Sequence, residues 1–247
     1  MRFFIELSYN GKLYHGWQIQ PNANTVQQTL ENGLNILLGT QISVVGAGRT
    51  DTGVHAQQMY AHFDCNETME IPNLIYKLNS YLPKDIAIRD IKQVKDDAHA
   101  RFDALSRTYT YRIGFKKNVF NFESAYYIKM PLDLDKMKAA SEILLHYKNF
   151  KCFSRSNTDV KTYNCGIKSV SWSQTENELV FKIQADRFLR NMVRAIVGTL
   201  VEIGLHKIEV EAMHEIISSQ DRAQAGPSAP AHGLYLSEIE YPNNIFL

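Results

Sequence analysis

Cysteine is scarce in this chain, which has three among its 247 residues: Cys65, Cys152 and Cys165. The number is odd, and no Cys-x-x-Cys pair occurs. A disulfide framework is therefore not expected, and neither is a zinc site built from thiolates. Both expectations agree with a reducing, cytoplasmic location.

Long hydrophobic runs are also lacking, since no stretch of about 18 uninterrupted apolar residues occurs. A membrane span is therefore not expected, and residues 1–6 have the pattern of a strand rather than that of a signal peptide. The chain also lacks a P-loop and a dinucleotide-binding fingerprint, so its sequence gives no sign of a nucleotide cofactor.

An excess of one charge is missing too, because 27 Lys and Arg residues face 26 Asp and Glu residues, for a net charge of +1. A strongly basic domain is the usual sign of a nucleic-acid-binding protein. This chain is not strongly basic, so any contact with RNA must rely on a local patch of positive charge. Composition alone indicates an ordinary soluble enzyme.

Apolar residues make up 45% of the chain, which is enough for one large domain or two small ones. Thr25 and Gln28 have the spacing of a capping box that opens a helix, and Gly39 is its expected stop. Strand-like and helix-like patterns mix along both halves, which favours the α+β class. Further helices are expected at 72–81, 133–147, 186–203 and 208–219, and strands at 3–9, 42–46, 57–64, 86–94, 107–115, 163–173, 178–185 and 234–240.

The most informative stretch is the loop Gly46–Ala56, with the sequence Gly-Ala-Gly-Arg-Thr-Asp-Thr-Gly-Val-His-Ala between two strand-like runs. Polar, turn-rich loops on a rigid scaffold commonly carry binding and catalytic residues. Three roles are open to Asp51: a turn residue that bonds its own backbone, a metal ligand beside His55 and His62, or a catalytic carboxylate held by an arginine. Spacing alone does not decide among them.

Three arginines, Arg187, Arg190 and Arg194, are spaced by three and four in a stretch expected to be helical. That spacing predicts one shared helix face. Such a face is either simply solvated or a cationic site, and Arg187 and Arg190 are candidates for contact with substrate phosphates. Tyr109 and Tyr111 alternate in an expected strand, where aromatic side chains commonly pack in the core.

The Asp51 loop resembles the G-R-T-D-x-G-V-H-A motif of the TruA family of tRNA pseudouridine synthases. Four further blocks of that family occur in family order, so the resemblance covers nearly the whole chain. They are Gly16–Gln18 with Gln20-Pro21 and Thr25–Gln27, His99–Phe102 with Arg107–Tyr111, Phe188–Gly198, and Gly233–Leu236 after Ala225-Gly226 and Pro230-Ala231. Ala98 departs from the pattern, because relatives more often carry an aromatic residue there.

The resemblance implies the pseudouridine synthase fold. In that fold, two ferredoxin-like or RRM-like halves form one continuous, mixed and mainly antiparallel sheet with helices and a central RNA-binding cleft. The expected halves are residues 1–104, with the catalytic Asp loop, and residues 105–247, which complete the cleft.

The resemblance also implies a reaction, the isomerisation of uridine to pseudouridine at positions 38, 39 and 40 of the tRNA anticodon stem-loop. The N1–C1′ bond of the uridine breaks and a C5–C1′ bond forms. Substrate and product are isomers, so no redox cofactor, nucleotide or metal is needed. Asp51 is the implied catalytic carboxylate, and attack on C1′, attack on C6 and a glycal route all remain open to it.

Other residues receive roles from the same resemblance. Arg194 corresponds to the arginine that pairs with the catalytic aspartate, and Tyr109 to the active-site tyrosine, whose ring stacks on a uracil. Leu234 is expected to line the uracil pocket. By the resemblance, Arg49 helps to open the substrate helix or occupies the place of the flipped base, and the alternative is that it orders its loop through an ion pair.

The expected partners are tRNA, bound through its anticodon stem-loop, and a second copy of the chain in a homodimer, with no membrane and no required metal. One rival hypothesis is a pseudouridine synthase with a different RNA target. Another is a non-catalytic RNA-binding module on the same fold. The joint presence of Asp51, Tyr109 and Arg194 argues against that module.

Overall fold

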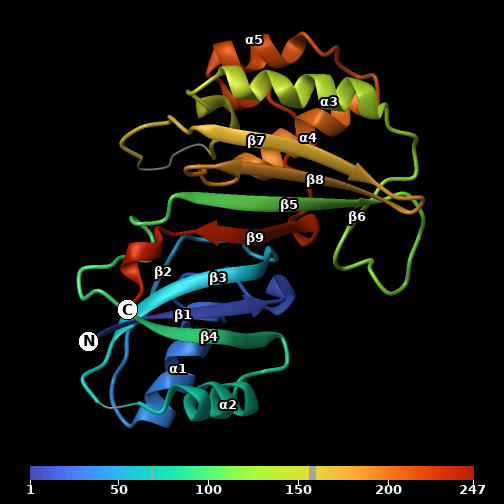
Figure 1. Cartoon of the computed structure of the whole chain (residues 1–247). Helices are drawn as coiled ribbons and strands as arrows, with labels where there is room; N and C mark the ends of the chain where they lie inside the picture. The colour runs from blue at the N-terminus through green and yellow to red at the C-terminus, as the bar shows by residue number, and fades with distance from the viewer. Residues whose placement is uncertain (68, 156–159) are drawn as a thin grey trace. The chain divides into compact units, whose positions relative to one another are not determined.

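The computed structural model describes residues 1–67, 69–155 and 160–247. The chain forms two compact units, one of Met1–Ser106 with Tyr235–Leu247 and the other of Arg107–Leu234. Each unit combines strands with helices (Figure 1), which confirms the α+β class. The C-terminal segment Tyr235–Leu247 belongs to the first unit, so these units differ from the expected halves 1–104 and 105–247, and that division stays a prediction.

Strand β1 (Arg2–Tyr9) lies inside the sheet of the first unit and pairs antiparallel with both β3 (His55–Asp64) and β4 (Ile86–Val94). Strand β3 also pairs antiparallel with the short β2 (Val45–Gly46) and parallel with β9 (Leu234–Glu240). The loop of the sequence motif therefore connects two neighbouring strands, β2 and β3.

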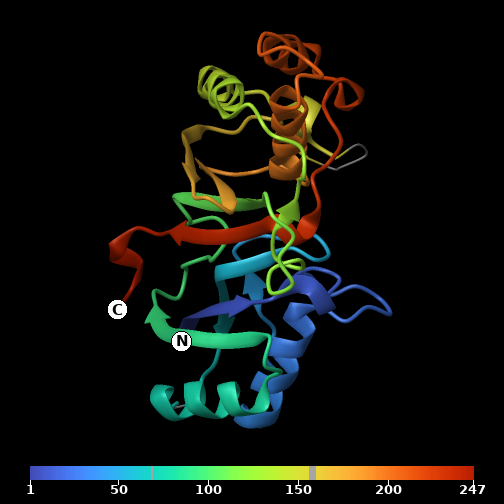
Figure 2. The same ribbon diagram turned by 90° about the vertical axis from the view of Figure 1, so that its right-hand side faces the viewer.

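Two helices of the first unit, α1 (Val26–Leu38) and α2 (Ile71–Tyr81), lie next to each other beside these strands (Figure 2). The predicted start of α1 is confirmed, because the Thr25 hydroxyl accepts a hydrogen bond from the Gln28 amide at 3.4 Å. The predicted stop is confirmed as well, since Gly39 adopts a left-handed conformation with φ of 68°.

The second unit has three antiparallel strands in the order β5 (Ser106–Gly114), β8 (Glu178–Ala185) and β7 (Ile167–Gln174). The two-residue β6 (Tyr126–Tyr127) pairs parallel with β5. Successive side chains of a strand point to opposite faces. Residues 109 and 111 of β5 therefore share a face, as their spacing predicts.

Helices α3 (Leu134–Ile143), α4 (Met192–Gly204) and α5 (Ala212–Ser219) lie together in the second unit (Figure 1). Helix α4 is buried along most of its length, which its run of apolar residues explains. Short 3₁₀-helices occur in the described chain at Gly11–Leu13, Leu144–His146, Lys151–Phe153, Arg222–Gln224, Ala231–Gly233 and Asn243–Ile245.

The helix expected at 186–203 is wrong at its start, because α4 begins only at Met192. Asn191 has a φ of 66°, in the left-handed region that interrupts a right-handed helix. The Asp186 carboxylate also accepts bonds from two amides, of Gly166 at 2.7 Å and of Arg187 at 2.6 Å, which fixes the chain in a non-helical turn. The strand expected at 42–46 is likewise shorter, and only Val45–Gly46 pairs.

Among the described residues, no helix is long and apolar enough to cross a membrane. The three cysteines are unpaired and buried. Burial raises the pKa of both the Cys152 and the Cys165 thiols to about 12. Because the thiolate is the reactive form, these two side chains are poor nucleophiles at neutral pH.

His62 of β3 is buried as a neutral imidazole, and its Nδ1 accepts a hydrogen bond from the Ala100 amide at 3.1 Å. Burial is the main cause that lowers the pKa of His62 from 6.5 to about 4, and the Arg2 guanidinium and the His99 ring add to it. Asp64 and Asp103 act in the opposite direction. Between about pH 4 and pH 6.5, His62 is therefore neutral in the folded protein but protonated in the unfolded chain.

We predict that His62 makes the protein less stable as the pH falls from 7 to 5. Between these pH values the unfolded chain binds more protons at this residue than the folded chain does. Titration of His62 therefore lowers the free energy of unfolding by about 2 kcal/mol as the pH falls from 7 to 5. His62→Gln keeps a hydrogen-bond acceptor but does not titrate, and its loss of stability should be smaller by that amount. Urea unfolding at both pH values measures the difference. The exposed His15→Gln is the control, and an equal loss in wild type and His62→Gln would contradict the prediction.

Candidate active site

The loop that carries Asp51 makes a tight turn immediately before β3. The Val54 amide donates to the Asp51 carbonyl at 3.1 Å, and Gly53, the third residue of the turn, has a φ of 77°. Glycine adopts this conformation without steric cost, and a type II turn needs it there. The Asp51 main-chain carbonyl thus closes the turn, and Asp51 as a whole is half-buried and has further interactions.

The last residue of β1 and the segment after it hold this loop on one side. The Tyr9 hydroxyl and the Thr50 hydroxyl form a buried hydrogen bond of 2.8 Å. The Thr50 carbonyl accepts from the Trp17 amide at 3.2 Å, and a Cβ placed on Gly16 would lie 2.3 Å from that carbonyl oxygen. Only glycine fits at position 16, so main chain lies against main chain directly before Asp51.

A second contact fixes the other end of the turn. A Cβ on Gly11 would lie 2.0 Å from the Val54 carbonyl oxygen, and the Gly11 amide donates to Nδ1 of His55 at 3.0 Å. The His55 ring is also stacked on the Tyr235 ring, with centroids 4.7 Å apart. Asp51 therefore lies between two anchored residues, Thr50 and Val54.

The histidines considered as zinc ligands have structural contacts. Nδ1 of His55 accepts from Gly11, and Nδ1 of His62 accepts from Ala100. Over residues 1–67, 69–155 and 160–247, no group of three or more His, Cys, Asp or Glu side chains lies close enough together to hold a metal ion.

Arg49 lies on the same loop and is exposed to solvent. Within the part of the chain that the structure describes, its guanidinium forms no ion pair and no hydrogen bond. The suggestion that Arg49 orders the loop through an ion pair therefore receives no support. Its charge is exposed on the Asp51 loop, two residues before the carboxylate.

Tyr109 and Tyr111 have different environments although they share a face of β5. The Tyr111 side chain is fully buried, and its hydroxyl donates to the Pro230 carbonyl at 2.8 Å. Burial raises the pKa of Tyr111 well above its usual value. Tyr109 is only half-buried, and its ring meets Phe188 edge to face at a centroid distance of 5.1 Å. The core role predicted for Tyr111 is confirmed.

Arg194 lies in the first turn of α4 and is partly buried. Its Nε donates to the Ala229 carbonyl at 2.7 Å, while the Ala229 amide donates to the Arg194 carbonyl at 2.9 Å. This reciprocal pair of bonds fixes the base of the guanidinium. Sequence reasoning missed the contact because it joins residues 35 positions apart, although Gly226, Pro227 and Pro230 mark a turn-rich segment there.

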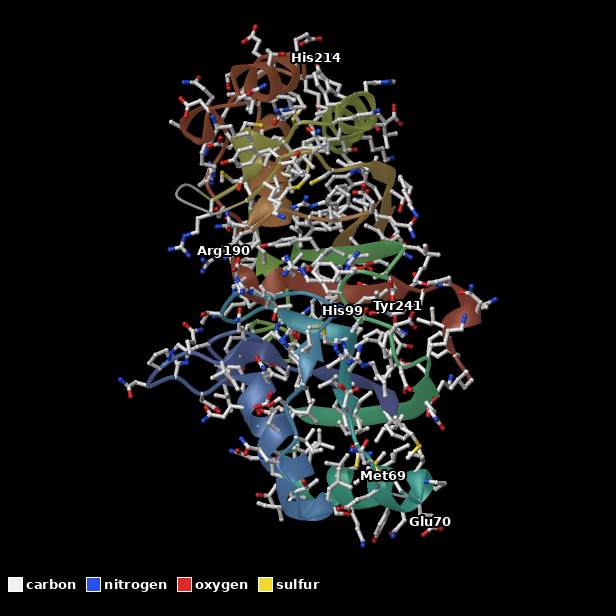
Figure 3. All side chains as sticks on the ribbon, turned by 90° about the vertical axis from the view of Figure 1, so that its left-hand side faces the viewer. Met69, Glu70, His99, Arg190, His214 and Tyr241 are labelled. Atoms are coloured by element: carbon white, nitrogen blue, oxygen red, sulfur yellow. The ribbon has the colours of Figure 1, made fainter. Side chains whose placement is uncertain are left out.

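The prediction that Arg187 and Arg190 share a helix face with Arg194 is wrong. Both residues precede α4, which begins at Met192. Arg190 is exposed at the surface (Figure 3), and its carbonyl accepts from the Arg155 amide at 3.0 Å. Arg187 is half-buried in the turn after β8. Helical spacing therefore gives no reason to treat the three arginines as one patch.

Leu234 is the first residue of β9 and is 5% exposed. A Cβ on the preceding Gly233 would lie 2.8 Å from the Tyr111 ring, so residue 233 lies directly against that side chain within the second unit. Asp51 and Arg49 belong to the first unit, while Tyr109, Arg187, Arg190, Arg194 and Leu234 belong to the second. The site roles of all seven stay predictions.

Comparison with known proteins gives a consistent result. A family model described as tRNA pseudouridine synthase matches residues 7–103 and 142–242. A protein from Parabacteroides distasonis is 50% identical over 246 residues, which cover 99% of this chain and 98% of that protein. One from Porphyromonas gingivalis is 50% identical over 251 residues, which cover 100% of this chain and 99% of that protein.

A more distant relative from Bacillus licheniformis is 39% identical over 247 residues, which cover 98% of this chain and 100% of the relative. All three proteins are named tRNA pseudouridine synthase A. The match of the family model extends well beyond half of the chain, and the resemblance inferred from the five sequence blocks is confirmed. The chain therefore belongs to the tRNA pseudouridine synthase family.

Proposed function

We propose that this protein isomerises uridine to pseudouridine at positions 38, 39 and 40 in the anticodon stem-loop of tRNA. Family membership supports the reaction class, and the relatives named tRNA pseudouridine synthase A support tRNA as substrate. The observation that carries the proposal is the anchored Asp51 loop, because it holds one carboxylate between two fixed residues. Action on three neighbouring positions suits recognition of RNA shape rather than base sequence.

Asp51 is the proposed catalytic carboxylate. The reaction breaks the N1–C1′ bond, turns the uracil and joins its C5 to C1′; the C5 proton is then released and N1 takes up a proton, so that the product is an isomer of the substrate. A fixed carboxylate suits attack on C1′, attack on C6 and proton abstraction from the sugar alike. Since no electrons or groups enter, the reaction needs no cofactor.

Four other roles complete the proposal. Arg194 pairs with Asp51 and keeps it ionised in a base pocket that is largely dry. Tyr109 stacks on the target uracil, and its half-buried ring suits that role better than the fully buried Tyr111. Leu234 forms an apolar wall of the uracil pocket, and the exposed Arg49 helps to open the substrate helix.

The arginines before α4 have a simpler role in this proposal. Arg187 and Arg190 contact tRNA phosphates, and the exposure of Arg190 agrees with this. We further propose that the protein acts in the cytoplasm as a homodimer, in which one subunit holds the tRNA body while the other presents Asp51. The motif resemblance alone supports the dimer.

We predict that Asp51→Ala abolishes pseudouridine formation but leaves tRNA binding within about tenfold, because one carboxylate is a small part of a phosphate-dominated interface. Turnover should fall by at least about a thousandfold. Tritium release from tRNA labelled at uridine C5, measured with EDTA present, reports the chemistry, and filter binding reports affinity.

Asp64→Asn is the matched control, because it changes a carboxylate at the opposite end of β3 that pairs with Arg2. This variant should release tritium at the wild-type rate. No release by the wild-type protein, despite tight binding of tRNA, would favour the non-catalytic RNA-binding module. An equal loss of binding and turnover in Asp51→Ala would contradict the catalytic role.

We predict that Arg194→Lys slows isomerisation by about a hundredfold, because a lysine keeps the charge but cannot bond both the Ala229 carbonyl and a carboxylate with fixed geometry. Single-turnover rates at saturating enzyme measure the effect. Arg89→Lys makes the same substitution at an exposed arginine of β4 and controls for the exchange of arginine for lysine itself. Unchanged turnover of a folded Arg194→Lys protein would remove Arg194 from the mechanism.

A further inference from the structure

Residues 225–230, which we term the strap, lie directly on helix α4. The Gly226 amide donates to the Thr199 hydroxyl at 2.9 Å, and the Ala229 amide donates to the Arg194 carbonyl at 2.9 Å. Between these bonds, a Cβ placed on Gly198 would lie 1.6 Å from the Pro227 carbonyl oxygen. The strap therefore contacts the main chain of α4 over more than one helical turn.

Arg222 holds the strap from its own side. One terminal nitrogen of its guanidinium donates to the Ala225 carbonyl at 3.2 Å and to the Gly226 carbonyl at 3.0 Å. The other donates to the Ser228 hydroxyl at 3.1 Å. A planar guanidinium with fixed donors thus fixes three points of the strap at once.

Ser228 links this arrangement to the start of α4. Its hydroxyl also accepts from the Asn191 side-chain amide at 2.7 Å. The next residue, Ala229, supplies the carbonyl that receives Nε of Arg194 at 2.7 Å. A chain of contacts therefore runs from Arg222 through Ser228 and Ala229 to Arg194.

This chain of contacts restricts the direction of the Arg194 guanidinium. A free arginine side chain samples many rotamers, and holding it in one of them costs conformational entropy. The bond from Nε to a fixed carbonyl restricts the plane of the guanidinium and the directions in which its terminal nitrogens can point. A shift of the strap at Ser228 and Ala229 would move this acceptor and release the arginine.

We propose that Arg222 is a positioning residue for the isomerisation, which acts through Ser228 and the Ala229 carbonyl to hold Arg194 in its productive orientation. The proposal rests on the role of Arg194 under the proposed function. Arg222 does not touch substrate in this account. Its loss should lower the rate of the chemical step and leave tRNA affinity intact.

Thr199 provides the matched control, because it anchors the same strap at Gly226, three residues before Ala229. Thr199→Val removes that bond with little change in volume, and it tests whether loosening the strap in general is enough to slow the reaction. Arg222→Lys retains the positive charge but loses the planar fork. Melting temperatures of both variants show how much each destabilises the fold.

The experiment measures single-turnover rates and tRNA dissociation constants for Arg222→Lys, Thr199→Val, Arg194→Lys and the double variant Arg222→Lys with Arg194→Lys. We expect Arg222→Lys to slow turnover about tenfold or more with unchanged tRNA affinity, and Thr199→Val to retain the wild-type rate. The double variant should be no slower than Arg194→Lys alone, because residues that act as a unit are not additive. Arg222→Ala is measured alongside these variants, and added guanidinium ion should partly restore its rate of turnover.

Three results would overturn the proposal. One is a wild-type rate in Arg222→Lys while Arg194→Lys is slow, which leaves the role of Arg194 intact. Another is an equal loss of rate in Thr199→Val and Arg222→Lys, which assigns Arg222 to general stability. The third is additive losses in the double variant. A wild-type rate in Arg194→Lys would instead remove Arg194 from the mechanism, and with it the role of Arg222, while the proposed isomerisation itself would stand.

Discussion

The position of Asp51 depends on main-chain contact between the segment after β1 and the loop before β3. Gly11 and Gly16 allow this contact, because any side chain there would overlap the carbonyl oxygens of Val54 and Thr50. Both segments continue from β1 and β3, which pair along most of their length. The loop is thus supported by a sheet, and a catalytic group needs this kind of rigid support if it is to meet a reacting atom within a fraction of an ångström.

The second unit fixes its charged group in a related way. Gly198 of α4 lets the strap approach the helix main chain, and a strap carbonyl then receives Nε of Arg194. In both units a missing side chain places two stretches of backbone in contact, and a polar residue next to that contact gains a fixed position. Such contacts are difficult to replace, because main-chain groups that lose a partner in the interior are costly to leave unsatisfied.

Local signals in the sequence predicted much of the fold. The cap at Thr25 and the glycine at position 39 set the ends of α1, and the strands expected at 86–94 and 234–240 have the observed bounds of β4 and β9. The spacing of the three arginines predicted too early a start for α4. Asn191 interrupts the helix with a left-handed backbone conformation, and the periodicity of the sequence does not reveal it. The anchors of Asp51 and Arg194 were also out of reach, because hydrogen bonds such as Tyr9–Thr50 join residues far apart in the chain.

Burial of the three cysteines has a practical consequence for work on this protein. The Cys152 and Cys165 thiols are protonated at neutral pH, and Cys65 is 4% exposed. A single cysteine introduced at a solvent-exposed position will therefore react with maleimide or iodoacetamide probes well ahead of the native thiols. Spin labels and fluorophores can be attached in this way without first removing any native cysteine, which keeps the packing of both units unchanged.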